Sequence, residues 1–594
     1  MRSLIVIAAC VLAVLGLILA LPTPDKHPET RKQEAREFAI VDTRIFDGQA
    51  FHASADIWVQ DGSIVAMGEN LDIPARVERI EGAGDTLLPG LIDAHVHTFG
   101  QAQSDALRFG VTTLLDMFTS PALLAEGRRL REDRSQSTKA DLYSAGMLAT
   151  ARSGHGTQFG VPVTPVTAPE QAEQWVDARI AEGSDFIKIV IEPGTLWGAS
   201  PLPTLNEDTV RALVTAAKAR GLMALAHVST QADAIMAIEA GVDGLVHVFA
   251  DAMASDAFIE LAKSNGVFVI PTAVVMAGVG GQLDLEALLA EPGIDQRISQ
   301  EQRQSLLQES WAKLNGQALL DRSLANVRAM HEAGIVLLAG SDAPNPGTAH
   351  GLSLHHELEL LVSSGVSPAE ALASATSVPA AVFGLEGRGC LTAGCRADMV
   401  WVKGNPQTDI RTTRQITQIW KNGRLVDRSF KPSAAASGDN VATDLLAEGV
   451  IRTWVPADDR FIGGQSIATI LSAENGQLEV KGDLNPGSPF PYSGAIWSPG
   501  QPFMTPVDLS DRKRLRIEIL GESNEWMVML FSGSGSNSSV PARVAMEKTA
   551  TGAAVEIRLE DIQGFDSSQL QAIGIFAVET PREFAFTMTE ARLE

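Results

Sequence analysis

Cysteine is scarce in this chain of 594 residues, which contains only three. Cys10 lies in an apolar run near the N-terminus, whereas Cys390 and Cys395 are separated by the segment Leu-Thr-Ala-Gly. No two cysteines form a CxxC pair, which argues against a cysteine-ligated zinc site. Export from the cytoplasm would allow Cys390 and Cys395 to form a disulfide across the two arms of a hairpin.

Positive charge is also in short supply. The sequence has 47 lysine and arginine residues against 72 aspartate and glutamate residues, and its net charge is −25. A surface of this sign repels nucleic acid, which excludes nucleic acid as a partner. Because single cores stop growing at about 250–300 residues, a chain of this length predicts two or more domains.

The N-terminus carries a long apolar run over residues 4–21, preceded by Arg2. As a helix with a rise of about 1.5 Å per residue, this run is about 27 Å long, close to the hydrocarbon thickness of a bilayer. No A-x-A cleavage site follows, and the run is longer than the apolar part of most signal peptides, about 7–15 residues. We expect residues 1–24 to be a signal peptide or an N-terminal membrane anchor, with the anchor favoured. The rest of the chain is then exported, to the periplasm in a bacterium.

Two segments of alternating polarity flank the middle of the chain. Over residues 37–86, short alternating runs are separated by Asp-Gly, and the same alternation returns over residues 389–430, with an Asn-Gly turn. Such patterns predict antiparallel strands joined by hairpins.

The pattern between these segments, over residues 87–388, is different. Apolar runs of strand length alternate with amphipathic helical stretches, such as 207–220 and 231–240. Near-continuous apolar strands are expected where both faces of a sheet are covered, and eight of them in succession predict a parallel (β/α)8 barrel. The runs are 86–97, 111–117, 140–148, 184–192, 222–228, 243–249, 267–272 and 335–343.

A third unit follows a small, polar linker over residues 431–440. Residues 441–594 contain many short alternating runs that are separated by turn residues. This spacing predicts an all-β sandwich or jelly roll.

Polar side chains that can bind a metal ion lie within, or at the C-terminal ends of, the apolar runs predicted to form the barrel strands. Barrel active sites lie at the C-terminal ends of the strands, so these side chains should share one rim. Alone, a histidine here would more often be a core residue, a lysine an ion-pair partner and an aspartate a helix cap. Together, imidazole and carboxylate groups predict a site for zinc or a similar ion. The residues are His95, His97, Lys188, His227, His247 and Asp342.

Lys188 is the unusual member of this set, because it stands between Ile187 and Ile189 in an apolar strand. Burial disfavours the ammonium form and lowers a lysine pKa. A neutral amine can take up carbon dioxide and become a carbamate, whose oxygens can bridge two metal ions. We treat carboxylation of Lys188 as a hypothesis.

The motifs LLPGLIDAHVH (87–97), DFIKI (185–189) and GSDA (340–343) resemble those of the metal-dependent amidohydrolases, in the imidazolonepropionase-like and prolidase-like branch. The resemblance covers about residues 37–430. It implies an α/β fold, in which a TIM-type barrel is flanked by a small β-sandwich built from 37–86 and 389–430. It also implies that His95, His97 and Asp342 hold one divalent ion and that His227 and His247 hold a second, with carboxylated Lys188 bridging both.

The resemblance further implies a binuclear hydrolase, with two zinc ions, that cleaves an amide-type C–N bond in a dipeptide, an N-acyl amino acid or a cyclic amide. Metal binding lowers the pKa of water from about 15.7 toward 7, which supplies a bridging hydroxide as the nucleophile. Asp342 would take the proton and deliver it to the leaving amine.

Two alternatives stay open. A mononuclear deaminase is one, but such enzymes in this superfamily lack the lysine and carry a glutamate soon after the histidine of the fifth strand. Here Val228, Ser229 and Thr230 follow His227. The other alternative is a non-catalytic binding protein on the same fold.

The substrate is harder to predict. Some relatives that cleave dipeptides have tyrosine where this chain has Ser229, which puts recognition of a dipeptide carboxylate in doubt. His155 and His350 follow the third and eighth runs and are candidate substrate contacts, although either could instead order its loop. The His355-His356-Glu357 segment is not a zincin motif, because Leu360 occupies the position of the second histidine.

The C-terminal unit begins with DRFIGGQS (459–466) and resembles the complex I intermediate-associated protein family. That resemblance implies a galactose-binding-like jelly roll. A sugar or protein ligand, or a role in packing alone, is compatible with it.

Overall fold

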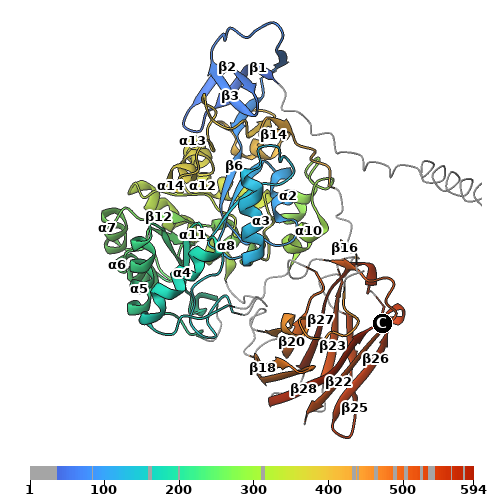
Figure 1. Ribbon diagram of the computed structural model, residues 1–594. Helices are drawn as coiled ribbons and strands as arrows, with labels where there is room; N and C mark the ends of the chain where they lie inside the picture. Colours follow the sequence, from blue (N-terminus) through green and yellow to red (C-terminus); the bar gives the residue numbers. More distant parts are fainter. Residues whose placement is uncertain are drawn as a thin grey trace, which may run out of the picture.

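The computed structural model describes residues 37–594 with several gaps (Figure 1). The predicted signal or anchor, residues 1–24, lies outside the described residues, as does most of the 459–466 motif. Across the part of the chain that is described, no helix combines the length and apolar character needed to cross a membrane. The gaps are 83, 158–162, 198–200, 309–314, 431–435, 438–440, 460–465, 486–490, 501–505, 522–525, 533–541, 564 and 579–581.

One eight-stranded sheet is built from both flanks of the central region. Its order is β15-β14-β13-β5-β1-β2-β3, and β4 pairs with β1. The pairing is antiparallel except where β4 and β5 run parallel to β1. The strands are β1 (Phe38–Phe46), β2 (Phe51–Gln60), β3 (Ser63–Gly68), β4 (Glu78–Glu81), β5 (Thr86–Pro89), β13 (Met399–Val402), β14 (Ile416–Lys421) and β15 (Arg424–Leu425).

The first apolar run divides between two sheets. Residues 87–89 belong to β5 in the eight-stranded sheet, so the barrel starts after Gly90 and not at residue 87. A side chain at Gly90 would lie 2.2 Å from the Thr112 hydroxyl, which explains why the chain crosses between the sheets at a glycine.

Cys390 and Cys395 form a disulfide, with their Cα atoms 6.1 Å apart. It closes the turn that precedes β13, and Ile64 of β3 donates a backbone hydrogen bond to the Cys395 carbonyl. The disulfide therefore closes a short loop within the C-terminal flank, and the backbone hydrogen bond from Ile64 joins that loop to a strand of the N-terminal flank.

The barrel consists of two runs of parallel strands that are joined by single bridges. The Ala149–Ile189 bridge links the third strand to the fourth, and the Val269–Leu337 and Val96–Ala343 bridges place residues 337–343 between the seventh strand and the first. This eighth segment closes the ring without forming a regular ladder. The regular strands are β6 (Leu91–Val96), β7 (Val111–Asp116), β8 (Asp141–Ser144), β9 (Ile187–Ile191), β10 (Ala224–Val228), β11 (Gly244–Val246) and β12 (Phe268–Ile270).

Helices alternate with these strands, as the sequence pattern predicts. Several of them begin at a hydroxyl or amide side chain that caps the first turn. Thr230 accepts a hydrogen bond from Asp233 N at the start of α6, and Asn206 accepts one from Thr209 N at the start of α5. The helices are α2 (Ala102–Arg108), α3 (Pro121–Glu132), α4 (Ala172–Glu182), α5 (Glu207–Ala219), α6 (Gln231–Glu239), α7 (Asp256–Ser264), α8 (Ala273–Val279), α9 (Leu285–Leu289), α10 (Gln300–Leu307), α11 (Gly316–Glu332), α12 (Leu352–Ser363), α13 (Pro368–Ser374) and α14 (Ser377–Val382).

The C-terminal region is all-β and contains two sheets (red in Figure 1). Burial alternates strictly along β19 and β22, and their buried residues share one apolar core with those of β23 and β27, so the two sheets pack face to face. One sheet contains β16 (Ala436–Ser437), β17 (Val455–Asp458), β20 (Tyr492–Trp497), β21 (Val507–Asp508), β23 (Trp526–Ser532), β24 (Ala542–Ala545) and β27 (Leu570–Val578). The other contains β18 (Ile467–Glu474), β19 (Gln477–Leu484), β22 (Arg514–Gly521), β25 (Glu547–Lys548), β26 (Gly552–Arg558) and β28 (Arg582–Leu593).

Candidate metal centre

Three of the predicted ligands converge on one point. His95 lies in β6, His97 follows it, and Asp342 stands in the segment that closes the barrel beside them. The Nε2 atoms of both histidines are 3.1 Å from Asp342 Oδ1 and 3.4 Å from each other. One ligand atom from each residue lies within 4.8 Å of the others, so this group could hold a divalent metal ion.

A second convergence lies beside the first. His227 in β10 directs Nδ1 toward Nε2 of His247, which follows β11, and the two atoms are 3.1 Å apart. The ring of His247 lies 4.8 Å from that of His95, between centroids, and its Nδ1 is 3.9 Å from Asp342 Oδ2. The two groups therefore form one continuous cluster at the C-terminal ends of the strands.

Lys188 lies in β9 with only 2% of its surface exposed. Its amine has no hydrogen-bond partner and no ion pair among the described residues, so it is not a structural ion-pair lysine here. Burial lowers the pKa of Lys188 to about 7, although the Asp342 and Asp116 carboxylates act in the opposite direction. A buried amine of this kind is suited to carboxylation, because only the neutral form reacts with carbon dioxide.

Burial favours the neutral imidazole in His95, His227 and His247, and this is the form in which histidine binds a metal. Burial lowers the pKa of His95, His227 and His247 well below its usual value. The ring nitrogens that face one another are therefore available as lone-pair donors.

Backbone geometry at the strand ends is unusual. His247, Asp342 and Thr272 have φ values of 72°, 52° and 49°, in the left-handed region that side chains other than glycine rarely adopt. Each such residue costs about 1–3 kcal/mol, and residues of this kind cluster at functional sites. Their concentration at this rim supports a functional rather than a purely structural role for the cluster.

Two buried aspartates hold the strand ends in place. Asp93 accepts hydrogen bonds from Ser341 N and Oγ at 2.9 and 2.6 Å and from His95 N at 3.2 Å, which ties β6 to the segment that carries Asp342. Asp116 accepts hydrogen bonds from Thr98 N and Ser144 Oγ at 2.5 and 2.8 Å. The backbone around His95 and His97 is thus fixed on both sides.

The two predicted substrate contacts occupy different positions. The ring of the half-buried His155 lies 5.0 Å from that of His227, between centroids, so it lies against the cluster. His350 donates a hydrogen bond from Nε2 to the His97 carbonyl at 2.9 Å, a contact that supports His97. Contact of either residue with substrate stays a prediction. His355, in α12, is bound to Thr413 and to the Phe109 carbonyl, away from the cluster.

Sequence reasoning missed Glu192. This residue directly follows β9, is 2% exposed, and has Oε2 3.1 Å from His227 Nε2. It is the last letter of the fourth apolar run, at the rim position occupied by the other site residues. That position was the available signal.

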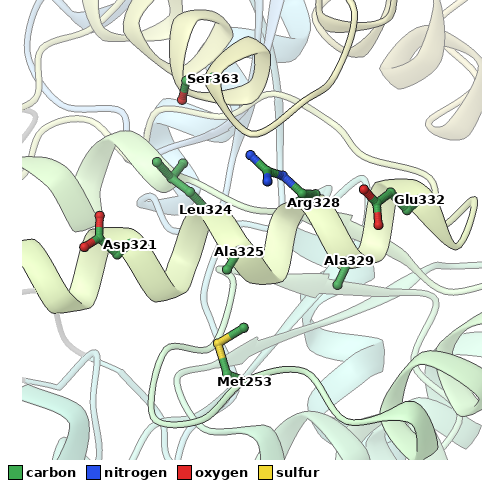
Figure 2. A pocket seen from close by; sticks show the side chains of 8 residues that line it. All are labelled: Met253, Asp321, Leu324, Ala325, Arg328, Ala329, Glu332 and Ser363. Carbon is green, nitrogen blue, oxygen red and sulfur yellow. The ribbon is translucent and has the colours of Figure 1, made fainter.

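A separate cavity of about 500 Å3 lies along the outside of α11. Figure 2 shows Asp321, Leu324 and Arg328 projecting from this helix, with Met253 on one side and Ser363 on the other. None of the predicted site residues lines it, so this cavity is distinct from the candidate metal centre.

Comparisons with known proteins show which proteins this chain is similar to. The model of the amidohydrolase family matches residues 86–426. The chain is 25% identical over 437 residues to ochratoxinase from Aspergillus niger, covering 64% of this chain and 84% of that protein. It is 28% identical over 398 residues to imidazolonepropionase from Symbiobacterium thermophilum, covering 62% and 88%. A crystal structure of an Xaa-Pro dipeptidase with bound methionine superposes with a TM-score of 0.53 at 22% identity, covering 66% of this chain and 99% of that one.

Proposed function

The chain belongs to the amidohydrolase family and is a hydrolytic enzyme, and on that premise we propose that it is a binuclear metal-dependent hydrolase cleaving an amide-type C–N bond in a small molecule. The observation that carries the proposal is the pair of adjoining ligand groups in the same barrel as Lys188, a buried lysine whose amine has no hydrogen-bond partner among the described residues. The names of the relatives, ochratoxinase, imidazolonepropionase and Xaa-Pro dipeptidase, support C–N hydrolysis.

The residues present fit two divalent ions, most simply zinc. His95, His97 and Asp342 would hold one ion and His227 and His247 the other, with Lys188, once carboxylated, bridging them. Neutral imidazoles, a carboxylate and a carbamate are the ligand types that zinc accepts. When bound, the ions would lower the pKa of water and polarise the substrate carbonyl.

Asp342 is the residue placed to move the proton. Its two oxygens reach both ligand groups, with Oδ1 at 3.1 Å from His95 Nε2 and Oδ2 at 3.9 Å from His247 Nδ1. A carboxylate at this junction can accept a proton from the attacking water and deliver it to the nitrogen that leaves.

The surroundings of Ser229 bear on the substrate. Its hydroxyl donates to Glu192 Oε1 at 2.9 Å, so its proton is already committed, and the nearest charge is a carboxylate. The Ser229 hydroxyl is therefore not free to bind a carboxylate of the substrate, and the Glu192 carboxylate beside it would repel one. We expect kcat/KM for an N-acyl amino acid amide to exceed that for the matching free acid by about tenfold, or about 1.4 kcal/mol.

This preference is measured by comparing each N-acyl amino acid with its amide and following the release of the amino product. A higher kcat/KM for the free acids would contradict the assignment of Ser229 and Glu192 to a carboxylate-excluding role.

We also propose that the chain is exported, held at the membrane by residues 4–21. The Cys390–Cys395 disulfide supports this, since such bonds persist in oxidising compartments. Cys390 and Cys395 should resist alkylation in intact cells until a reductant is added, and protease applied outside the inner membrane should digest the body of the chain. Free thiols at Cys390 and Cys395, together with full protection from protease, would reject export.

For residues 441–594 we propose a galactose-binding-like jelly roll that acts as a binding module. The two face-to-face sheets support that fold, and the match to the amidohydrolase family ends at residue 426. Deleting residues 441–594 should leave kcat and KM within about twofold while abolishing retention on a glycan array or a partner. A collapse in barrel stability would instead assign the region to packing.

A further inference from the structure

Glu192 is held by an unusually complete set of donors for a buried carboxylate. Its Oε1 accepts hydrogen bonds from Ser229 Oγ at 2.9 Å and from Gly194 N at 2.5 Å. Its Oε2 lies 3.1 Å from His227 Nε2 and accepts a longer bond from Trp197 Nε1 at 3.4 Å. Both oxygens are therefore engaged, and the carboxylate has one defined orientation toward His227.

This contact decides where the ring proton of His227 lies. A carboxylate oxygen can only accept, so Nε2 carries the hydrogen and, in the neutral ring, Nδ1 carries the lone pair. Nδ1 is the atom that faces His247 Nε2 at 3.1 Å. Without Glu192, the neutral ring could place its hydrogen on Nδ1, where it would block the lone pair.

We propose that Glu192 is a positioning residue that fixes His227 in the tautomer able to bind the second metal ion. This inference rests on the proposed binuclear function, because it concerns the His227–His247 half of the centre. Ser229 and Gly194 donate hydrogen bonds to the Glu192 carboxylate, and this carboxylate accepts one from Nε2 of the His227 imidazole. Nδ1 of His227 is then free to bind the ion. A carboxylate behind a metal-binding histidine commonly contributes about 10–100-fold to metal affinity.

The tautomer of His247, the other histidine of the second metal site, is less firmly fixed. His247 Nδ1 lies 2.7 Å from Thr272 Oγ1, and a hydroxyl can either donate or accept. Thr272 thus permits both tautomers of His247, whereas Glu192 permits one tautomer of His227. Glu192 is therefore the residue that fixes a histidine tautomer at the second metal site.

The test compares Glu192→Ala, Glu192→Gln and Ser229→Ala in the full-length protein. The metal-free forms are titrated with Zn2+ against a chromophoric chelator, in the presence of bicarbonate so that Lys188 can be carboxylated. Glu192→Ala should weaken the affinity for the second zinc ion about 10–100-fold and leave the affinity for the first zinc ion within about threefold. Glu192→Gln can still present an amide oxygen to Nε2, but its NH2 group then faces the N–H donor of Gly194, so it should recover only part of that loss. Ser229→Ala removes a donor to Glu192 and leaves the His227 contact in place, so it should change the second equivalent by less than about threefold.

The same titration distinguishes a failure of the Glu192 proposal from a failure of the binuclear function. If wild type binds two equivalents and Glu192→Ala binds both with unchanged affinity, Glu192 only orders its loop and the inference is wrong. If wild type binds a single equivalent or none, the binuclear function itself is wrong. Should Glu192→Ala fail to fold, Glu192→Asp, which withdraws the carboxylate by one methylene, carries the test. It should weaken the second equivalent about tenfold, and an unchanged affinity would overturn the proposal.

Discussion

Lys188→Met is expected to remove at least one of two bound metal ions and to lower kcat/KM by about a thousandfold, or about 4 kcal/mol of transition-state stabilisation. Methionine matches the length and apolar character of the lysine stem but cannot form a carbamate. Because Lys188 Nζ has no partner among the described residues, its loss breaks no ion pair. Metal content by mass spectrometry and turnover of an amide substrate measure the two effects.

A second buried lysine provides the matched control. Lys421 is fully buried, and its amine lies 2.8 Å from Asp398 and 3.1 Å from Asp141. Lys421→Met leaves buried carboxylates without their partner, so it should cost about 3–5 kcal/mol of stability while the metal content of each folded chain stays unchanged. If Lys188→Met retains both ions and full turnover, the bridging role is wrong.

Asp342→Asn is expected to lower kcat by about 10²–10⁴-fold, the usual contribution of a positioned acid–base group. Asparagine keeps the shape of the side chain but cannot carry the proton. The loss should be largest for substrates with a strongly basic leaving amine and smaller for a nitroanilide, whose nitrogen leaves without prior protonation.

The leaving-group comparison distinguishes proton transfer from metal loss. Zinc content should be measured on the same Asp342→Asn preparation. An equal loss of rate for alkylamides and nitroanilides, accompanied by loss of zinc, would assign Asp342 to metal binding alone. An unchanged kcat would contradict both roles.

The strand-end positions of the site could be predicted because barrel topology converts sequence order into spatial proximity. His95 and His227 are far apart in the chain, yet each stands where an apolar run ends, and parallel strands bring those ends to one rim. The alternation of β19 and β22 was equally readable, because each strand has one buried face.

Other features depend on contacts that no local pattern encodes. The rim position of Glu192 could be read from the sequence, but its role arises from the contact with His227, which lies on the neighbouring strand β10. The change of sheet at Gly90 falls within an unbroken apolar run, so periodicity gave no boundary there. The eighth barrel segment pairs through single bridges at Leu337 and Ala343, and its left-handed residue Asp342 could not be foreseen from an apolar run.

The metal-to-protein ratio of the full-length chain, measured after reconstitution with zinc and bicarbonate, tests the central claim most directly. Two ligand groups and a carboxylated Lys188 predict two zinc ions per chain, with the second lost when bicarbonate is withheld. One ion per chain, unaffected by bicarbonate, would contradict a lysine-bridged binuclear centre.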